Sequence, residues 1–427
     1  MASIPVLLLF SSVLLFSLST FPPLCSCSAS VLSTPSTGHH ALVVPIRKDP
    51  LANVYSIPLK QGRASFLLDI GGPLLWSACS AFHPTFPCNS KICMVARTFH
   101  NPICPLAKIL PGPSCTCYAT PVNPLTNKCI FADLTSTDVI ISTTDGHNPT
   151  GSVTISGVTS SCASRAVLKS LPRGIAGVAG LARSGLALPA QFASKFSFKR
   201  QFAICLPSTS DATGVAFFGN PPFFFLAVPE FEATARLTYT KLKRNKMSPG
   251  YFLSLAGIAV GGQTVEFLQR VLDFDSLGHG GVKLSTVTPY TVLHRHIYLP
   301  FLKAYARATS GIPRAPKVAP FDLCLKSSAL GSTRMGYGVP QIDLMLVEGR
   351  NWTMFGANIL KQVDAGTACL AFVDGGPKAE RAVVVGAFQM EDNFLLVDVA
   401  RSRLGFTSSL LGVRTTCANF NFTTAAN

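Results

Sequence analysis

The feature of the sequence that most limits its fold is a long-range repeat of a strand, a turn and an apolar run that ends in a polar loop. Val54 to Trp76 reads strand, turn and apolar strand, and then places Asp69 in the stretch DIGGPLLW. Tyr251 to Leu293 reads strand, Gly-Gly turn, insertion and the strand GGVKL, and then places Ser285 before TVTPYTVL. A second apolar run into glycines follows each copy, first GIAGVAGLARSGLALPAQ and later VVVGAF. The repeat predicts two related lobes with a central cleft, and one loop from each lobe at its floor.

The length and composition indicate a folded, turn-rich chain with more than one core. The 427 residues exceed one ordinary domain, and 48% are apolar but only 13% charged. We expect an N-terminal lobe at 30–226, a linker region at 227–248 and a C-terminal lobe at 249–427. Strand signals are short and separated by Gly or Pro turns, as in ALVVPIR, VYSIPLK, DVIIST, SVTISGV and AVVVGAF. Helical patterns are few, the best being Leu188–Ser194 and Tyr298–Ala308, so we predict a mostly β fold with few short helices.

The N-terminal segment at 1–29 has the features of a secretory signal peptide. Its apolar run, Ile4 to Phe21, is followed by two prolines and by small residues that end at Ala29, as at a cleavage site. No Lys or Arg marks the start, and the competing interpretation is a membrane anchor. No later segment is long and apolar enough to span a bilayer. We therefore expect the mature chain to be secreted and to make no membrane contact.

Cysteine usage favours an oxidising compartment. Two of the 14 cysteines lie in the signal segment, and the even number that remains predicts about six disulfides. The motif Cys115-Thr116-Cys117 lacks the spacing of a zinc site, so we expect no metal. Sequons at Asn351 and Asn421 are consistent with a secreted glycoprotein. The cysteines expected in disulfides are Cys79, Cys88, Cys93, Cys104, Cys115, Cys117, Cys129, Cys162, Cys205, Cys324, Cys369 and Cys417.

The formal net charge of +16 raises the question of an acidic partner. Nucleic acid is not expected, because a secreted chain rarely meets it and the basic residues are scattered apart from Lys241–Lys246. Two interpretations remain. The charge keeps the protein soluble in an acidic medium, or it attracts acidic cell-wall polymers or acidic proteins.

The chemistry that two such loops would support is acid–base catalysis by paired carboxylates. Two carboxylates facing each other at about 3 Å cannot both ionise, so they share a proton. One then holds a water as base while the other acts as acid, and peptide hydrolysis by this route needs both. The loops also need a small residue after each acid and a hydroxyl that braces one loop against the other. Asp69 has the position of one such acid.

At these loops the sequence resembles the pepsin-like aspartic proteases, in which each lobe carries Asp-Thr/Ser-Gly. The resemblance covers nearly all of the mature chain. It rests on DIGGPLLW at 69–76, GIAGVAGLARSGLALPAQ at 174–191 and VVVGAFQMEDNFLLVDVARSRLGF at 383–406. It implies a two-lobed, mostly β fold with a central cleft.

The departures from this pattern bear on function. After Asp69 the hydroxyl residue is replaced by Ile70, and the second loop reads Ser-Thr-Val at 285–287. The second carboxylate is therefore missing, and a β-branched residue replaces the small one. The repeat register places Asp273 and Asp275 in the preceding insertion, which disfavours a rescue by either. We predict no catalytic residue and no cofactor, with Asp69 and Ser285 at the two positions of a degenerate dyad.

Within that family, the chain resembles a plant subgroup. It includes wheat-type xylanase inhibitors, carrot extracellular dermal glycoprotein, xyloglucan-specific endoglucanase inhibitors and legume basic 7S globulins. The matching stretches are LLDIGGPLLWS at 67–77, ADLTSTDVIISTTDG at 132–146, TVTPYTVL at 286–293 and GFTSSLLGVRTTCANFNFT at 405–423. The resemblance implies a protein of the apoplast or cell wall. It would act in plant defence by blocking the substrate cleft of microbial glycoside hydrolases.

A single cation on a protruding loop is the expected inhibitory element. A glycosidase cleft holds two acidic residues, and an inserted cation can make charge-assisted hydrogen bonds to both. In the wheat-type inhibitors that this chain resembles, the inserted residue is a His in the loop before the last Cys. The corresponding loop here, TSSLLGVRTT at 407–416, has no His. Its Arg414 matches the endoglucanase-inhibitor branch, so we predict Arg414 as the cation, with Leu410 and Leu411 as apolar contacts. The alternatives are a solvated surface Arg and core leucines.

Two other classes of function stay open. An active aspartic-type endopeptidase would need another acid in place of Ser285. A peptide-binding or storage protein like the basic 7S globulins is the other, although nothing in the sequence marks a peptide site. Casein digestion and capture of partners from microbial culture filtrate separate these classes from the inhibitor.

Overall fold

The structure is a computed structural model that describes residues 41–60, 64–98, 104 and 115–423. The predicted signal peptide at 1–29 lies outside the described residues. Strands dominate the described chain, and all helices except α4 (Arg295–Ala308) are short. The prediction of a mostly β fold with few short helices is confirmed. None of the described helices combines the length and the apolarity needed to cross a bilayer.

The predicted elements match those of the structure. The five segments predicted as strands overlap β1, β2, β6, β7 and β28, and the two predicted helices correspond to α3 and α4. The helices are α1 (Lys91–Ala96), α2 (Arg165–Leu168), α3 (Leu188–Phe196), α4 (Arg295–Ala308), α5 (Gly356–Ile359) and α6 (Ala387–Met390). The strands of the N-terminal half are β1 (Ala41–Lys48), β2 (Tyr55–Pro58), β3 (Ser65–Asp69), β4 (Leu75–Ser77), β5 (Tyr118–Ala119), β6 (Ala132–Thr144), β7 (Pro149–Cys162), β8 (Ile175–Gly180), β9 (Gln201–Cys205), β10 (Thr213–Gly219), β11 (Phe224–Phe225) and β12 (Phe231–Glu232). Those of the C-terminal half are β13 (Thr238–Lys243), β14 (Phe252–Leu253), β15 (Leu255–Val260), β16 (Gln263–Thr264), β17 (Val282–Leu284), β18 (Thr291–Leu293), β19 (Arg314–Ala315), β20 (Cys324–Lys326), β21 (Ser332–Thr333), β22 (Gly336–Tyr337), β23 (Ile342–Leu346), β24 (Asn351–Met354), β25 (Leu360–Asp364), β26 (Thr367–Leu370), β27 (Phe372–Asp374), β28 (Val383–Val385), β29 (Phe394–Asp398) and β30 (Arg403–Phe406).

The long-range repeat takes the same form in both halves. In the first, β3 is parallel to β8, and β4 is antiparallel to β8. In the second, β17 is parallel to β28, and β18 is antiparallel to β28. Close backbone approach explains the glycine at the end of each apolar run. A Cβ would lie 2.5 Å from the Gly72 oxygen at Gly180, and 2.3 Å from the Tyr290 carbonyl carbon at Gly386. The loops after β3 and β17 therefore occupy equivalent positions.

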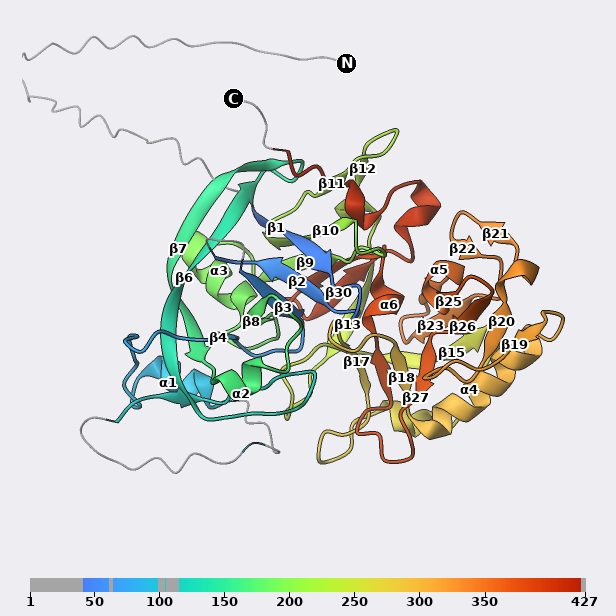
Figure 1. The fold of residues 1–427 in the computed structure, drawn as a ribbon, viewed down its shortest axis with the longest axis horizontal. Coiled ribbons are helices and arrows are strands. Elements are labelled where there is room, and N and C mark those ends of the chain that lie inside the picture. The colour runs from blue at the N-terminus through green and yellow to red at the C-terminus, as the bar shows by residue number, and fades with distance from the viewer. Residues whose placement is uncertain (1–40, 61–63, 99–103, 105–114, 424–427) are drawn as a thin grey trace, which may run out of the picture. The chain divides into compact units, whose positions relative to one another are not determined.

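A sheet of antiparallel pairs joins the two halves, in the order β1-β10-β9-β29-β30-β13. These strands lie in the middle of Figure 1, with the long hairpin of β6 and β7 on one side and α4 on the other. Successive residues of β9 enter different apolar clusters, Phe202 and Ile204 one, Ala203 and Cys205 another. Both faces of the sheet are therefore covered, as strands this apolar require. The predicted lobe boundaries, 30–226 and 249–427, stay a prediction.

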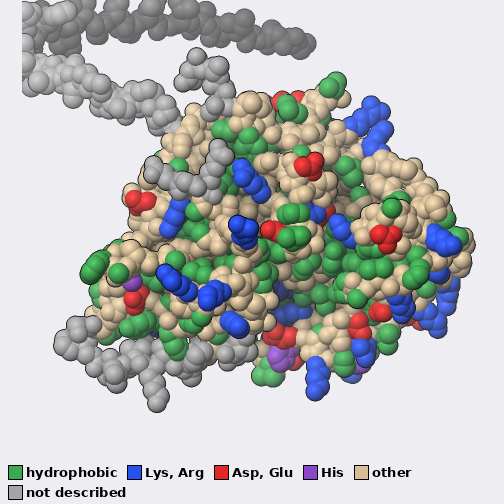
Figure 2. All heavy atoms as spheres, viewed as in Figure 1, with side chains coloured by type: hydrophobic (Ala, Val, Ile, Leu, Met, Phe, Trp, Pro, Cys, Tyr) green, Lys and Arg blue, Asp and Glu red, His purple; other side chains and the backbone are tan. Residues whose placement is uncertain are grey.

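The twelve cysteines named above form six disulfides. The bond Cys205–Cys417 spans 212 residues and ties β9 to the C-terminal tail. The others are Cys79–Cys162, Cys88–Cys115, Cys93–Cys117, Cys104–Cys129 and Cys324–Cys369. On the face shown in Figure 2 the Lys and Arg side chains are spread out rather than gathered into one basic field.

Candidate functional site

Asp69 ends β3, and its carboxylate turns back onto the loop that follows it. The residue is only 8% exposed, and Oδ1 accepts a hydrogen bond from the Gly71 amide at 2.8 Å. A Cβ at Gly72 would lie 3.0 Å from Asp69 Oδ2 and 3.1 Å from the Gly180 Cα, so this tight position favours glycine. Burial raises the pKa of Asp69, while the Lys283 ammonium and the amides of Gly71 and Gly72 oppose the rise.

The second half of the chain places a positively charged side chain, Lys283, near Asp69. Lys283 lies in β17, two residues before Ser285 and so on the same side of the strand. A Cβ at Gly71 would lie 3.3 Å from Asp69 Oδ1 and 3.5 Å from Lys283 Nζ, so the two charged groups converge on this glycine. Burial lowers the pKa of Lys283, and the carboxylate of Asp69 opposes this shift. The sequence analysis missed Lys283, although a lysine inside an otherwise apolar parallel strand is itself a signal.

Ser285 supplies no acid in place of the missing carboxylate. Its buried Oγ accepts hydrogen bonds from the Thr288 amide at 3.2 Å and the Thr288 hydroxyl at 2.9 Å. Its own amide donates to the Val385 oxygen at 3.0 Å. The side chain therefore closes a local turn, a common use of serine in loops. Asp69 and Ser285 together offer one carboxylate where a proton-sharing pair needs two.

Hydrogen bonds connect the two loops, but only from a side chain of the second loop to the backbone of the first. Thr286 Oγ1 donates to the Leu68 oxygen at 2.5 Å and accepts from the Ile70 amide at 3.2 Å. The Ile70 side chain, which has no hydroxyl to return the contact, is buried in the main core. Val287 packs against the apolar cluster of the first half that contains Trp76, and its backbone avoids the left-handed region. The loop thus accommodates valine where the family pattern has glycine.

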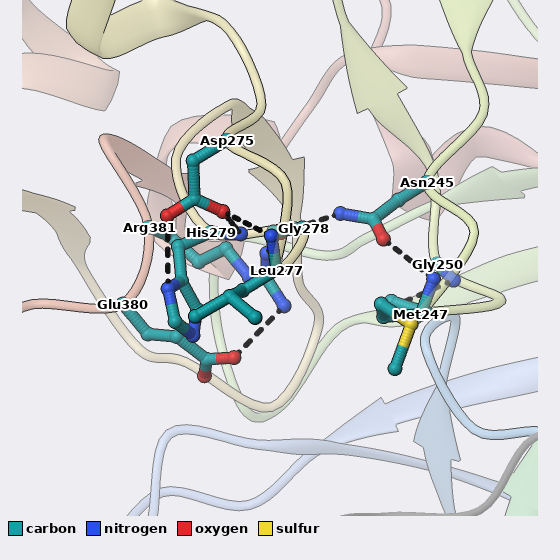
Figure 3. A network of polar contacts seen from close by, with 10 residues as sticks. Asn245, Met247, Gly250, Asp275, Leu277, Gly278, His279, Glu380 and Arg381 are labelled. Atoms are coloured by element: carbon teal, nitrogen blue, oxygen red, sulfur yellow. Dashed lines mark hydrogen bonds and ion pairs between the residues drawn. The ribbon is translucent and has the colours of Figure 1, made fainter.

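Asp273 and Asp275 are engaged elsewhere. Asp273 pairs with Lys243 Nζ at 2.8 Å. Asp275 accepts from the Leu277 and His279 amides at 2.9 and 2.8 Å and faces His279 Nδ1 at 3.1 Å, as Figure 3 shows. Both line a pocket of about 350 Å³. Neither carboxylate affects the pKa of Asp69, which agrees with the register argument against a rescue.

The structure of the tail loop bears on the predicted partner contact of Leu410. Leu410 begins a short 3-10 helix, Leu410–Val413, and is 0% exposed, in an apolar cluster with Phe394 and Phe420. Its amide donates to the Asp392 oxygen at 2.8 Å. The prediction that Leu410 contacts a partner is wrong, because the tail folds back and uses this leucine as its own core anchor. Leu411 is half-buried.

Arg414 follows this helix and is exposed, with a left-handed φ of 61°. The chain is fixed again directly after it. Thr415 Oγ1 donates to the Leu226 oxygen at 2.8 Å, and Cys417 is bonded to Cys205. Within the part of the chain that the structure describes, no hydrogen bond or ion pair engages the Arg414 guanidinium. The loop therefore presents a free cation between two fixed points.

The remaining predicted sites lie apart from these loops. Asn351 begins β24 and is exposed, and Asn421 is half-buried with its Oδ1 accepting from the Thr423 amide at 3.0 Å. Among the described residues, Cys79, His83 and Cys162 bring three metal-ligating atoms together. Both sulfurs are bonded to each other in a disulfide, so they cannot ligate a metal as thiolates.

Comparison with known proteins supports the family resemblance. Models of the xylanase inhibitor N-terminal and C-terminal regions match residues 55–220 and 250–408. The chain is 44% identical over 400 residues to a protein of Oryza sativa subsp. japonica named chitinase CLP, covering 90% of this chain and 92% of that protein. It is 38% identical over 424 residues to one of Nicotiana benthamiana named probable aspartic proteinase GIP2, covering 93% and 96%.

A solved structure agrees with these relatives. The crystal structure of EDGP matches with a TM-score of 0.84 at 36% identity, covering 91% of this chain and 100% of that chain. The two matched regions span most of the sequence. The first contains the parallel pair of β3 and β8, and the second contains the equivalent pair of β17 and β28. The chain therefore belongs to the xylanase-inhibitor family, with its two-lobed, pepsin-like β fold.

Proposed function

We propose that this chain is a secreted, catalytically inactive pepsin-like protein that inhibits microbial glycoside hydrolases, either a xylanase or a xyloglucan-specific endoglucanase. It would act in the plant apoplast as a defence protein. The observation that carries the proposal is Arg414, an exposed cation with no partner among the described residues, on a loop that is fixed at both ends. Six disulfides and the exposed sequon at Asn351 support an extracellular location.

Inactivity follows from the electrostatics around Asp69. Proton sharing requires two carboxylates that face each other without a counter-ion. Here an ammonium, Lys283, favours the ionised form of the single carboxylate, and Ser285 is committed to its own turn. Asp69 then has a structural role, because its carboxylate accepts from the loop amide of Gly71.

The backbone at Arg414 is held in the left-handed region, which is unfavourable for arginine. A non-glycine residue in the left-handed region costs about 1 kcal/mol, which glycine at the same place would avoid. The buried Leu410 and the disulfide at Cys417 keep the loop in this shape. A loop whose backbone is fixed before binding loses little backbone conformational entropy when it enters a target site.

Arg414 suits a cleft that holds two carboxylates. Its planar guanidinium presents paired N–H donors that match a carboxylate, and such charge-assisted bonds strengthen when water is excluded. A glycoside hydrolase places two catalytic carboxyl groups about 5–10 Å apart in its cleft. One guanidinium can therefore engage both and exclude the substrate.

The names of two relatives point to other activities, chitin hydrolysis and proteolysis. Both chemistries call on carboxyl groups in pairs or with substrate assistance. The single carboxylate of Asp69, opposed by Lys283, argues against pepsin-type proteolysis in this chain. Chitin hydrolysis is tested directly with chitin oligosaccharides. A peptide-binding role would leave Arg414 without an assigned partner. The same assay panel separates these possibilities.

The test is titration of the purified mature chain against fungal xylanases and xyloglucan-active endoglucanases, with casein and chitin oligosaccharides as substrates beside them. Arg414→Gly is the decisive variant, because glycine keeps the left-handed backbone and removes only the side chain. Arg350→Gly serves as the control, since Arg350 is also exposed. Loss of charge-assisted bonds worth about 1.5–3 kcal/mol should weaken inhibition by about 10- to 150-fold.

The assay results distinguish the inhibitor, the role of Arg414 and an active enzyme. Inhibition that Arg350→Gly retains and Arg414→Gly loses supports the inhibitor and its cation. Inhibition that both variants retain would remove Arg414 from the contact while leaving the inhibitor in place. Inertness towards every glycosidase would refute the proposed function, and hydrolysis of casein or chitin would show that the chain is an enzyme.

A further inference from the structure

Three arginines from separate segments converge on the turn between β29 and β30. Arg183 follows β8, Arg200 directly precedes β9 and Arg244 directly follows β13. Arg183 Nη1 and Arg244 Nη2 donate to one acceptor, Ser402 Oγ, at 3.1 and 3.3 Å. Arg200 Nη2 donates to the backbone oxygens of Arg183 and Ser184 at 2.7 and 2.8 Å. These bonds bring the three side chains close enough for their charges to act on one another. We call Arg183, Arg200 and Arg244 the arginine cluster.

The charge of the arginine cluster is not balanced by the described part of the chain. None of its members forms an ion pair there. Burial lowers the pKa values of Arg183 and Arg200, and repulsion from Arg244 lowers both further. Asp398 in β29 is already engaged, because its Oδ2 pairs with Arg403 at 3.1 Å and with Arg401 at 3.5 Å. A cluster of like charges in partly desolvated surroundings is unfavourable unless an anion joins it.

Several donors of the arginine cluster also lack an acceptor. Nε and Nη2 of Arg183 and Nε of Arg200 are buried with no partner among the described residues. A buried donor without an acceptor is costly, and more so when it carries charge. Ser402 Oγ is the acceptor that Arg183 and Arg244 share, and one hydroxyl cannot neutralise two guanidinium groups. The cluster therefore lacks both acceptor oxygens and negative charge.

We propose that the arginine cluster binds an oxyanion, that is, a carboxylate, sulfate or phosphate group, between Arg183 and Arg244. Arg244 is exposed and gives access from solvent, whereas Arg183 and Arg200 are half-buried and form the inner wall. The Arg183 guanidinium lies 5.3 Å from the ring centre of Tyr251, which limits its movement. Guanidinium forks match the paired oxygens of these anions.

Binding at this place would tie the two halves of the molecule together. Arg183 and Arg200 belong to the N-terminal half, whereas Arg244 and Ser402 belong to the C-terminal half. The Arg183 amide already donates to the Pro249 oxygen at 2.9 Å across the same junction. The oxyanion has two possible sources, a free inorganic anion or the uronate of an acidic polysaccharide. The exposed lysines Lys241 and Lys246 beside Arg244 would favour a polymer.

The test is calorimetric titration of the mature chain with sodium sulfate and, separately, with trigalacturonate, against chloride at matched ionic strength. Arg183→Gln and Arg244→Gln should each weaken binding about tenfold or more, because each removes one charged wall. Arg350→Gln, an exposed arginine outside the cluster, should bind as the wild type does. In buffer without oxyanion, Arg244→Gln should melt above the wild type, because repulsion inside the cluster is relieved.

Each outcome decides the proposal. Binding of sulfate alone identifies a free anion, and binding of trigalacturonate alone identifies a polymer carboxylate. Binding of both supports a site that accepts either source. The proposal fails if neither probe binds beyond the chloride control. It also fails if both cluster variants bind as tightly as the wild type does, because the heat would then come from other cations.

Discussion

Replacing Lys283 by methionine should expose how Asp69 is stabilised. The two groups form no ion pair within 4.0 Å, yet a Cβ at Gly71 would lie 3.3 Å from Asp69 Oδ1 and 3.5 Å from Lys283 Nζ. Their separation is therefore between about 4 and 7 Å, which corresponds to about 2–4 kcal/mol at an effective dielectric constant of about 20. Methionine keeps the length of the side chain and removes only the charge.

The sign of the pH dependence follows from the direction of the Asp69 shift. Burial holds the pKa of Asp69 above its ordinary value of 3.8, and the loss of Lys283 should raise it further. The unfolded chain then releases its proton at lower pH than the folded chain does, so stability falls as pH rises. Lys283→Met should therefore be destabilised most near pH 7 and least at about pH 3, where Asp69 is protonated in both proteins.

The assay is urea unfolding of wild type, Lys283→Met, Asp69→Asn and the double variant at both pH values. Urea is preferred because guanidinium chloride would screen the charges. We expect a coupling energy of about 2–4 kcal/mol near pH 7. Lys378→Met, which changes an exposed lysine, should match the wild type at both pH values. A coupling below about 0.5 kcal/mol, or an equal loss at both pH values, would refute the role given to Lys283.

Three further predictions concern other parts of the molecule. Ser285→Asp should leave casein intact at about pH 4, because an ammonium still faces the restored pair; pepstatin-sensitive cleavage would contradict this. Leu410→Ala should lower the free energy of unfolding in urea by about 2–5 kcal/mol, whereas the half-buried Leu411→Ala should cost less. Burial raises the pKa of Glu391 to about 7, so wild-type stability should fall as pH rises from about 4.5 to 7. Glu391→Gln should flatten that fall in melting scans, and an unchanged slope would assign it to another group.

The sequence predicts the parts of this structure that local patterns determine. Short apolar segments such as ALVVPIR became strands because β-branched residues between turn formers have few alternatives. The repeat also located Asp69 and Ser285 at equivalent loop positions, since strand, turn and glycine recur in the same order. These features depend on neighbours in the chain, and a reader of the sequence can see them.

Long-range packing decided what the sequence could not. The sequence leaves Leu410 as either a contact residue or a core leucine, and only the folded tail places it in the cluster of Phe394 and Phe420. Lys283 stands out in the sequence as a lysine in an apolar strand, but only the approach of the first loop gives it a partner. Arg183 of the arginine cluster meets Ser402, 219 positions further along the chain, and no local pattern predicts such a meeting.

The loops around Asp69 and Ser285 differ from the pepsin-like pattern at several positions whose effects depend on one another, not only at the missing acid. An aspartate at 285 alone would meet the Lys283 ammonium, which favours two ionised carboxylates over one shared proton. Removal of Lys283 alone would leave the buried Asp69 without its counter-charge. Glycine in place of Val287 would remove a side chain that packs against the Trp76 cluster and leave a cavity. Each of these single replacements should therefore be unfavourable while the other residues stay as they are.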